Sequence, residues 1–440
     1  MWGNAQPELQ SWGRCRRVAQ RGVEQHWRDA ILPSASPRSL LPYGQGRSYG
    51  DVAQNSGGTL LRTRGLDRFI AFDEARGVLS AEAGTRLSEV LALAAPRGWY
   101  LPVVPGTQFV SVGGAIANDV HGKNHHRRGT FGRHVLRFEL LRTDGTRIVC
   151  SPTEHRAWFE ATIGGLGLTG LVTWAELALE RVPGTNVDIE TLPCTSYAEF
   201  ASLCDASDAT HAYTVAWFDC FSYRDGRFRG LFTRANHAAG SPRPSSPLGT
   251  VAFTPPFGLV RPAAMRAFNL AYFKSGLRRA HKVQTVPLDR FLYPLDRVDR
   301  WNRLYGPRGF LQLQCAIPGG RAQDGIDALL ESIAASGQGS LLAVLKRFGA
   351  QPSPGILSFP LEGTTLALDF PCAGEATFRL FERLHAIVRG HGGRLYPAKD
   401  TCMSPADFEV GYPDWRRILP FLDPGFGSDL WRRVTSGLGA

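Results

Sequence analysis

The sequence predicts an α+β protein built from two domains. Short apolar runs alternate with turns over residues 59–182, without the regular βαβ repeat of a parallel sheet. After Pro183 the pattern of expected helices and strands changes. A loop rich in Pro, Ser and Gly lies at 238–249, and we expect it to be exposed. Over residues 310–370 the order is strand, helix, strand, strand. That order favours one antiparallel sheet with helices on a single face.

Local patterns place the elements of the first half. The stretch TRLSEVLALAAPRG at 85–98 has the apolar spacing of an amphipathic helix. The stretch VLRFELLRTDGTRIVCSP at 135–152 predicts a hairpin, because Asp144-Gly145 is a strong turn signal between two apolar runs. Further short strands are expected at 59–63, 68–72 and 78–84.

The second half contains both helical and strand-like patterns of apolar residues. Helices are expected at 196–206, 324–337 and 377–393, and strands at 212–221, 310–318, 341–349 and 364–371.

Composition restricts the class of protein. Hydrophobic residues make up 43% and charged residues 20% of the chain, as in a soluble globular protein. The first 20 residues lack the apolar core of a signal peptide, and no apolar run is long enough to span a bilayer. We therefore expect a cytoplasmic protein, with a peripheral contact at the inner membrane left open.

The net charge of +11 comes almost entirely from arginine, since the chain has only five lysines. This charge is a weak argument for nucleic acid, and we expect no nucleic-acid partner. It is compatible with anionic ligands or an anionic membrane surface. The eight cysteines are scattered without a C-x-x-C pair, which argues against a zinc site or a disulfide framework and favours free thiols.

One glycine motif is in the wrong context. Residues 165–170, GLGLTG, fit the G-x-G-x-x-G fingerprint of dinucleotide-binding folds. A Rossmann loop leaves a strand and opens a helix, whereas this stretch follows a helical pattern and precedes a strand-like one. We interpret it as a tight structural crossing.

Three other stretches belong together. They are GQGRSYGD at 44–51, VPGTQFVSVGGAIANDVHGKNHH at 104–126 and RLYPAKD at 394–400. By glycine content alone the first fits either a surface turn or a loop that cradles an anion with backbone N–H groups. With FEATIGGLGLTG at 159–170, their order and spacing resemble the FAD domain of the vanillyl-alcohol-oxidase-like, PCMH-type flavoproteins. Within these, HGKNHH and RLYPAKD resemble the decaprenylphosphoryl-β-D-ribose 2-oxidase family, which is related to D-arabinono-1,4-lactone oxidases.

The resemblance covers residues 41–400 and implies a domain plan. An FAD-binding domain would occupy 1–182, a substrate-binding cap domain with an antiparallel sheet 183–393, and a segment returning to the FAD domain 394–440.

The resemblance also implies which residues hold FAD. Related aldonolactone oxidases place a flavin-linked histidine where this chain has Arg47, so the expected FAD is non-covalent. The implied cofactor-binding residues are Gly44, Gly46, Arg47, Ser48, Tyr49, Gly50 and Asp51 in the first loop, Gly106, Ser111, Val112, Gly113 and Gly114 in the second, Asn118, His121 and Gly122 beside the isoalloxazine, and Val172 and Tyr396 further along.

Lys399 and His121 are the first candidates for chemistry. Related oxidases carry a lysine near the flavin at the position of Lys399, whereas an exposed ion pair with Asp400 is the alternative. His121 would lie beside the flavin by resemblance, although a lone histidine is more often structural. Together with His125 and His126 it suggests a metal site only weakly, because no carboxylate or thiol accompanies them, and we expect no metal.

The substrate side of the site follows from the same resemblance. Gln312 and Gln314 stand where aldonolactone oxidases have Glu-x-Arg, and alternation along a strand places both amides on one sheet face. Glutamine is not a base at neutral pH, so Lys399 or water would accept the proton. Lys346 would face the site, although a solvated strand residue is the alternative. The remaining expectations are a sugar pocket walled by Tyr49 and Trp217, with core packing as the rival role of Trp217, and Ala367 in place of a family cysteine known for capturing covalent inhibitors.

The implied function is an FAD-dependent oxidation of a sugar secondary alcohol to a ketone. The expected substrate is a polyprenylphosphoryl-β-D-ribose oxidised at C2, the first half of a 2-epimerisation to arabinose for cell wall polysaccharide. A short-chain dehydrogenase/reductase would then be a partner. The alternatives are a soluble aldonolactone or polyol oxidase, disfavoured by Arg47 and by the two glutamines, and a flavin-free binding protein that keeps the fold.

Overall fold

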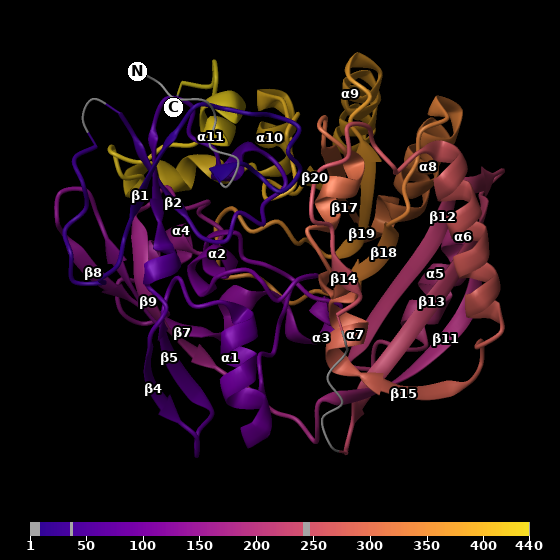
Figure 1. Ribbon diagram of the computed structural model, residues 1–440, viewed down its shortest axis with the longest axis horizontal. Coiled ribbons are helices and arrows are strands. Elements are labelled where there is room, and N and C mark those ends of the chain that lie inside the picture. Colours follow the sequence, from indigo (N-terminus) through magenta and orange to yellow (C-terminus); the bar gives the residue numbers. More distant parts are fainter. Residues whose placement is uncertain (1–8, 36–37, 241–246, 440) are drawn as a thin grey trace.

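The computed structural model describes residues 9–35, 38–240 and 247–439, and Figure 1 shows them as two lobes side by side. The segment 241–246 of the expected exposed loop lies outside the described residues. The first lobe contains most of the chain before residue 183, and the second is built around one large sheet. The first and the last described segments of the chain both lie at the first lobe (Figure 1). The two-lobed α+β class expected from the sequence is confirmed.

The first lobe holds two sheets. A parallel sheet has the order β1 (Arg21–Glu24), β3 (Thr59–Arg62), β2 (Leu40–Tyr43). An antiparallel sheet has the order β4 (Phe69–Asp73), β5 (Val78–Glu82), β9 (Leu171–Ala178), β7 (Val135–Leu141), β8 (Arg147–Cys150). The β7–β8 hairpin is confirmed, and Gly145 at its turn has φ +86°, which favours glycine.

Short helices connect these strands. They are α1 (Leu87–Ala94), α2 (Val112–Ala117), α3 (His125–Arg128) and α4 (Arg156–Thr162), and the small strands β6 (Trp99–Tyr100) and β10 (Glu180–Arg181) pair with each other.

The second lobe is an eight-stranded sheet in which every neighbouring pair is antiparallel. Its order is β15 (Val283–Pro287), β11 (Asn186–Ser196), β13 (Arg227–Ala238), β12 (Tyr213–Arg224), β18 (Ala343–Phe348), β19 (Gly363–Pro371), β17 (Phe310–Pro318), β20 (Arg394–Leu395). The edge strand β20 immediately follows the expected boundary at residue 393, and the domain limits of 182 and 393 stay predictions.

One face of this sheet is covered by helices. The helices α5 (Tyr197–Asp205), α8 (Ala322–Ser336) and α9 (Glu375–Gly390) share a buried core with inward side chains of the strands, including Phe218 and Leu313. Each such helix buries an apolar stripe of the kind that a sheet face requires. The opposite face of β17 therefore presents Gln312 and Gln314.

The helices α8 and α9 lie on one face, as expected from the order of elements over 310–370, whereas α6 (Pro262–Leu277), where no helix was predicted, lies on the other face. Gly276 of α6 packs closely on Leu231 of β13, whose neighbour Phe232 belongs to the core on the other face. A strand alternates its side chains between faces, so α6 lies opposite α5, α8 and α9. Most of α6 is exposed, because only Met265, Asn269 and Gly276 are buried.

The remaining elements join the lobes. They are α7 (Leu288–Leu292), the paired strands β14 (Gly249–Thr250) and β16 (Val298–Asp299), and the C-terminal helices α10 (Pro405–Gly411) and α11 (Asp429–Val434). Within the described residues, none of the helices combines the length and the apolar character that crossing a membrane requires.

Candidate active site

A deep cavity runs between the two lobes. From the first lobe it is lined by the glycine loop after β2, by the segment around α2 and by the turn before β9; from the second lobe it is lined by the face of β12, β18, β19 and β17 that lacks α5, α8 and α9. The glycine-rich segments of the first lobe and the strands of the second lobe therefore border the same cavity.

The first glycine loop forms one end of this cavity. Residues 44–49 line it, and Gly46 has φ +62°. A Cβ at Gly44 would collide with Ser111 Oγ, so glycine lets the two loops come together. The N–H groups of residues 45–48 donate no hydrogen bond to any part of the chain that the structure describes. Unpaired N–H groups on a glycine loop suit an anionic ligand.

The second glycine segment lines the cavity through Gly106, Ser111, Gly113 and Gly114. Ser111 caps α2, because its hydroxyl accepts the N–H of Gly114 at 3.2 Å. No atom lies within 4 Å of a Cβ placed on Gly106, so this side of the loop is open space.

The turn with the sequence GLGLTG connects α4 to β9, which agrees with rejection of a Rossmann loop. Its residues 166, 167 and 170 nevertheless line the cavity, followed by Leu171 and Val172 at the start of β9. The stretch is therefore a structural crossing that also provides part of the cavity wall.

The cavity lining is strongly basic. Arg47, Lys123, Lys346 and Lys399 line it, and Asp296 is the only carboxylate among the lining residues in the described part of the chain. Burial lowers the pKa of Lys123 to about 7 and that of Lys346 to about 8. An excess of buried cations is costly unless an anion joins them, so the cavity fits an anionic ligand.

Arg47 lies between two aromatic rings. Its guanidinium carbon is 4.1 Å from the ring centroid of Trp12 and 5.3 Å from that of Phe109. Burial lowers its pKa, and the carboxylate of Asp296 opposes that shift. A planar, permanently charged group held this way is a fixed donor toward the cavity.

Lys399 is buried beside the cavity, which rules out the exposed pair with Asp400. Its ammonium nitrogen is 3.4 Å from the ring centroid of Tyr49. Burial lowers its pKa, and the charge of Asp369 raises it; burial likewise raises the pKa of Asp369. Gln312 donates a hydrogen bond to Asp369 Oδ1. Lys399, Asp369 and Gln312 thus form one polar group on the cavity face of the sheet.

His121 is the centre of a second polar group. Its Nδ1 is 3.3 Å from Lys346 Nζ, and its Nε2 is 3.0 Å from the terminal amide of Gln314. Burial, followed by the charge of Lys346, lowers the pKa of His121 far below its ordinary value. Lys346 has only protons to donate, so Nδ1 accepts and Nε2 carries the proton of the neutral ring. Gln314 then accepts through its amide oxygen, because the two ends of an amide are interchangeable by rotation.

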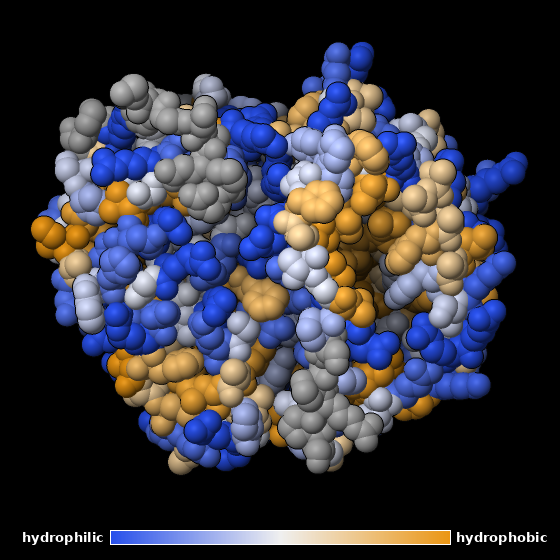
Figure 2. All heavy atoms as spheres, in the orientation of Figure 1, coloured by the Kyte–Doolittle hydropathy of each residue, from blue (hydrophilic) through white to orange (hydrophobic). Residues whose placement is uncertain are grey.

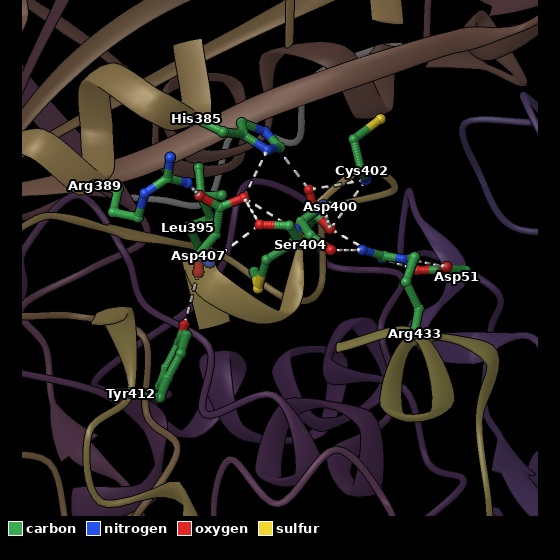
Figure 3. Close-up of polar contacts among 11 residues, drawn as sticks. Asp51, His385, Arg389, Leu395, Asp400, Cys402, Ser404, Asp407, Tyr412 and Arg433 are labelled. Carbon is green, nitrogen blue, oxygen red and sulfur yellow. Dashed lines mark hydrogen bonds and ion pairs between the residues drawn. The ribbon is translucent and has the colours of Figure 1, made fainter. Parts of the chain in front are cut away.

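A charge network lies behind the cavity and involves the C-terminal helix (Figure 3). Arg433 of α11 donates to Asp51 at 2.7 and 3.0 Å and to Asp400 at 3.0 Å. Asp400 follows Lys399 directly, and a Cβ at Gly50 would collide with the carbonyl oxygen of Asp400. Arg433 therefore fastens the end of the glycine loop to the segment that carries Lys399.

Most of the residues proposed from the sequence lie around the cavity, while four of them do not line it. Gly50 and Asp51 lie behind it, Val112 is in the core of the first lobe, and Trp217 packs on Tyr272 of α6 with ring centroids 4.7 Å apart. The residues that do line it are Gly44, Gly46, Arg47, Ser48, Tyr49, Gly106, Ser111, Gly113, Gly114, Asn118, His121, Gly122, Val172, Gln312, Gln314, Lys346, Tyr396 and Lys399.

Sequence reasoning missed several residues of the site. Lys123 was within the HGKNHH motif and was not assigned a role, and Asp296 and Trp301 had no motif around them. Asp369 was detectable, because it follows Ala367 by two positions on a strand and therefore shares its face. Ala367 lines the cavity and pairs with Gln314 and Val344, so no thiol stands at that position.

FAD fits these residues. The unpaired N–H groups of the glycine loop and the basic side chains suit a pyrophosphate, and the space between the lobes is open at Gly106.

Comparisons with known proteins agree with this reading. Residues 31–151 match the FAD binding domain family. The chain is 37% identical to the decaprenylphosphoryl-beta-D-ribose oxidase of Mycolicibacterium smegmatis, over 90% of this chain and 89% of that protein. It is 35% identical to an uncharacterised Streptomyces coelicolor protein (79% of this chain, 99% of that one) and 26% identical to L-gulonolactone oxidase of Scyliorhinus torazame (43% and 42%).

The cavity and the matched domain define an FAD-dependent oxidoreductase of the PCMH type. Within that class, the chain belongs to the decaprenylphosphoryl-β-D-ribose oxidase family.

Proposed function

We propose that the protein oxidises the C2 hydroxyl of a polyprenylphosphoryl-β-D-ribose to a ketone. The observation that carries this proposal is the set of polar side chains that line the cavity beside Ala367, namely Gln312, Gln314 and Lys346 of the sheet together with Lys399 and His121. The relative from Mycolicibacterium smegmatis is named for oxidation of such a substrate. Bound FAD, held non-covalently, would supply the hydride acceptor.

The chain's own residues would position the alcohol and hold its proton. A buried amine whose pKa is lowered toward neutrality is suited to exchange a proton at physiological pH, which favours Lys399 as the group facing the hydroxyl. The amides of Gln312 and Gln314 would orient the sugar, since each can donate and accept. Lys346 would meet the negative charge of the substrate phosphate.

His121 would be a positioning and hydrogen-bonding residue. Its neutral ring is held by Lys346 on one nitrogen and Gln314 on the other, so it links the two substrate-facing side chains. In this proposal it acts without changing its charge, because burial and the charge of Lys346 lower its pKa and so favour the neutral ring.

The proposal includes partners. The ketone is an intermediate of a 2-epimerisation to arabinose, so a short-chain dehydrogenase/reductase would reduce it on the other face. A polyprenyl chain is retained by a bilayer, so the protein would work as a peripheral protein at a membrane surface.

Anaerobic addition of substrate to the purified yellow protein tests the proposal. We expect polyprenylphosphoryl ribose to bleach the flavin absorbance within seconds, and free ribose to leave it unchanged. Equal bleaching by free ribose, or bleaching only by aldonolactones or polyols, would contradict the proposed substrate and assign the activity to those compounds. A purified protein without flavin that takes up no added FAD would point to a binding protein.

A further inference from the structure

The outer face of α6 and the segment before it form an exposed apolar surface. Fifteen large hydrophobic side chains are exposed in the described part of the chain, and nine of them lie within residues 248–283. Phe253 is 71% exposed, and Leu248 and Val283 are each 67% exposed. The other members of this surface, called the α6 patch below, are Phe257, Leu259, Phe268, Leu270, Tyr272 and Leu277.

The α6 patch contains many more exposed hydrophobic side chains than the single ones that ordinary soluble surfaces carry. Soluble surfaces carry single exposed hydrophobic residues, whereas contiguous apolar patches mark interaction sites. Figure 2 shows hydrophobic side chains gathered around a hollow on the side of the molecule where α6 and β14 lie. Phe268 and Tyr272 stack on each other with ring centroids 6.0 Å apart, one turn apart on the outside of the helix.

Within its own segment of the sequence the α6 patch carries only positive charge, and the carboxylates beside it belong to neighbouring strands, Glu190 of β11 opposite Val283 and Asp299 of β16 opposite Thr250. No Asp or Glu occurs in the sequence between Asp225 and Asp289. Within residues 248–283 the cations are Arg261, Arg266, Lys274, Arg278, Arg279 and Lys282. A helix that combines exposed aromatic and aliphatic side chains with basic residues is typical of a surface that lies in the headgroup region of an anionic bilayer.

The α6 patch is joined to the wall of the cavity. The N–H of Leu248 donates to the carbonyl of Arg297 at 2.7 Å, and the N–H of Val251 donates to that of Asp299 at 2.9 Å. Asp296 and Trp301, on either side of these acceptors, line the cavity. On the α6 side, Tyr272 contacts Trp217, which pairs with the cavity residue Val344.

We propose that the α6 patch docks the protein on an anionic lipid bilayer, next to the entrance through which the substrate's sugar reaches the cavity. The choice of a bilayer rests on charge complementarity. A second copy would bring two basic surfaces together and be repelled, whereas anionic headgroups attract six cations and the acyl region accepts the apolar side chains. The link to a lipid-borne substrate rests on the proposed function; the docking itself does not.

Vesicle sedimentation with the full holoenzyme tests the docking. We expect binding to vesicles of phosphatidylcholine with 30% phosphatidylglycerol, at least about tenfold weaker binding to phosphatidylcholine alone, and loss of binding at 0.5 M salt. The variants F253S/F257S and K274E/R278E should each reduce binding to anionic vesicles about tenfold or more. The matched controls are I31S, an 85% exposed apolar position on the first lobe, and R76E, an exposed arginine, and both should bind as the parent does.

Parental binding by both patch variants would overturn the docking, as would equal binding to neutral vesicles. Concentration-dependent dimerisation that the patch variants abolish would also overturn it and assign the surface to a second copy. Activity separates this proposal from the function. We expect the patch variants to oxidise a water-soluble short-chain prenylphosphoryl ribose at the parental rate and to lose about tenfold on a long-chain substrate in vesicles. Oxidation of neither substrate by the parent would refute the function and leave the docking result standing.

Discussion

The ammonium nitrogen of Lys399 lies 3.4 Å from the centre of the Tyr49 ring, so the segment after β20 and the first glycine loop meet at the cavity. The contact is a cation–π interaction in a buried place, and Asp369 provides the opposite charge. It fixes an amine of lowered pKa beside the space that the flavin and the sugar would share.

Replacement of Lys399 by Met tests the importance of that amine. Met keeps the length of the side chain and removes the proton-carrying group, so we expect the rate of flavin reduction to fall by about 10²-fold to 10⁴-fold. FAD should still bind, since other cations remain in the cavity. Anaerobic stopped-flow absorbance measures the rate. Tyr49→Phe is the control for the contact, because it keeps the ring under Lys399 and should stay within about threefold of the parent. A Lys399→Met protein that reduces its flavin at the parental rate would exclude this role.

The affinity for FAD should depend on pH. Lys123 and Lys346 have lowered pKa values of about 7 and about 8, and their charged forms add to the positive potential of the cavity, which attracts the anionic cofactor. Raising the pH from 6.5 to 9 deprotonates them in the free protein, so the dissociation constant should rise by about tenfold or more. Fluorescence titration of FAD into the FAD-free protein measures this. The pH dependence should be weaker in Lys346→Met, and an affinity constant across this range would contradict the prediction.

Lys346→Met should also stabilise the FAD-free protein. The lysine is buried, and burial alone lowers its pKa from 10.5 to about 8. The folded state therefore binds this proton more weakly than the unfolded state, which costs stability fully below about pH 8. The cost fades as the pH rises toward 10.5, where both states are deprotonated. We expect a gain of about 1 to 3 kcal/mol at pH 7 that shrinks by pH 10.

Urea unfolding at the two pH values measures that gain, with Lys274→Met on the exposed surface of α6 as the control that should change little. A loss of stability at pH 7 would show that the hydrogen bond from Lys346 to His121 outweighs the cost of burying the charge. Stability gained together with activity lost is the expected pattern for a group placed for function.

Local rules predicted much of the site because the signals were local. Alternation along a strand was sufficient to place Gln312 and Gln314 on one face, and the glycine content identified the loop at 44–49. The resemblance then connected segments that no local rule brings together. The role of the GLGLTG stretch was only half predicted, because whether a turn also borders a cavity depends on what packs opposite to it.

Other features depend on tertiary contacts that local patterns do not contain. Trp217 faces the expected side of β12, but α6 lies over that part of the sheet, so the indole packs on Tyr272 and donates to the carbonyl of Leu341. The helix α6 lacks a continuous apolar stripe, because glycine and asparagine form most of its buried contact, and it was not foreseen. The pairing of Lys399 with Asp369 joins residues on separate elements.

The flavin should be released by acid. The resemblance predicts that Arg47 stands in the place of the flavin-linked histidine of related oxidases, and arginine forms no such bond. It is held at 4.1 Å from Trp12 and lines the cavity. Precipitation with trichloroacetic acid should leave yellow FAD in the supernatant, identified by its mass. Flavin that stays with the pellet would show a covalent link through another residue. Released FMN in place of FAD would contradict the assignment of the cofactor.

Arg433 should control the stability of the link between the glycine loop and Lys399. Arg433→Met leaves two buried carboxylates, Asp51 and Asp400, without their shared cation (Figure 3). Breaking a buried pair by removal of one partner costs about 3 to 5 kcal/mol, whereas an exposed pair contributes about 1 kcal/mol or less. Arg416→Met, which removes the exposed pair with Glu409, is the matched control.

Chemical unfolding of the FAD-free proteins measures the loss in free energy of unfolding for both R433M and R416M. A second substitution separates charge from packing: because Asp51→Asn removes one of the stranded charges, the double variant D51N/R433M should be more stable than R433M alone. If R433M and R416M lose the same small amount, solvent already compensates Asp51 and Asp400 and the network does not hold the loop. If R433M loses several kcal/mol and D51N restores part of it, the C-terminal helix stabilises the cofactor loop through this charge, and the affinity for FAD should fall in R433M and recover in the double variant.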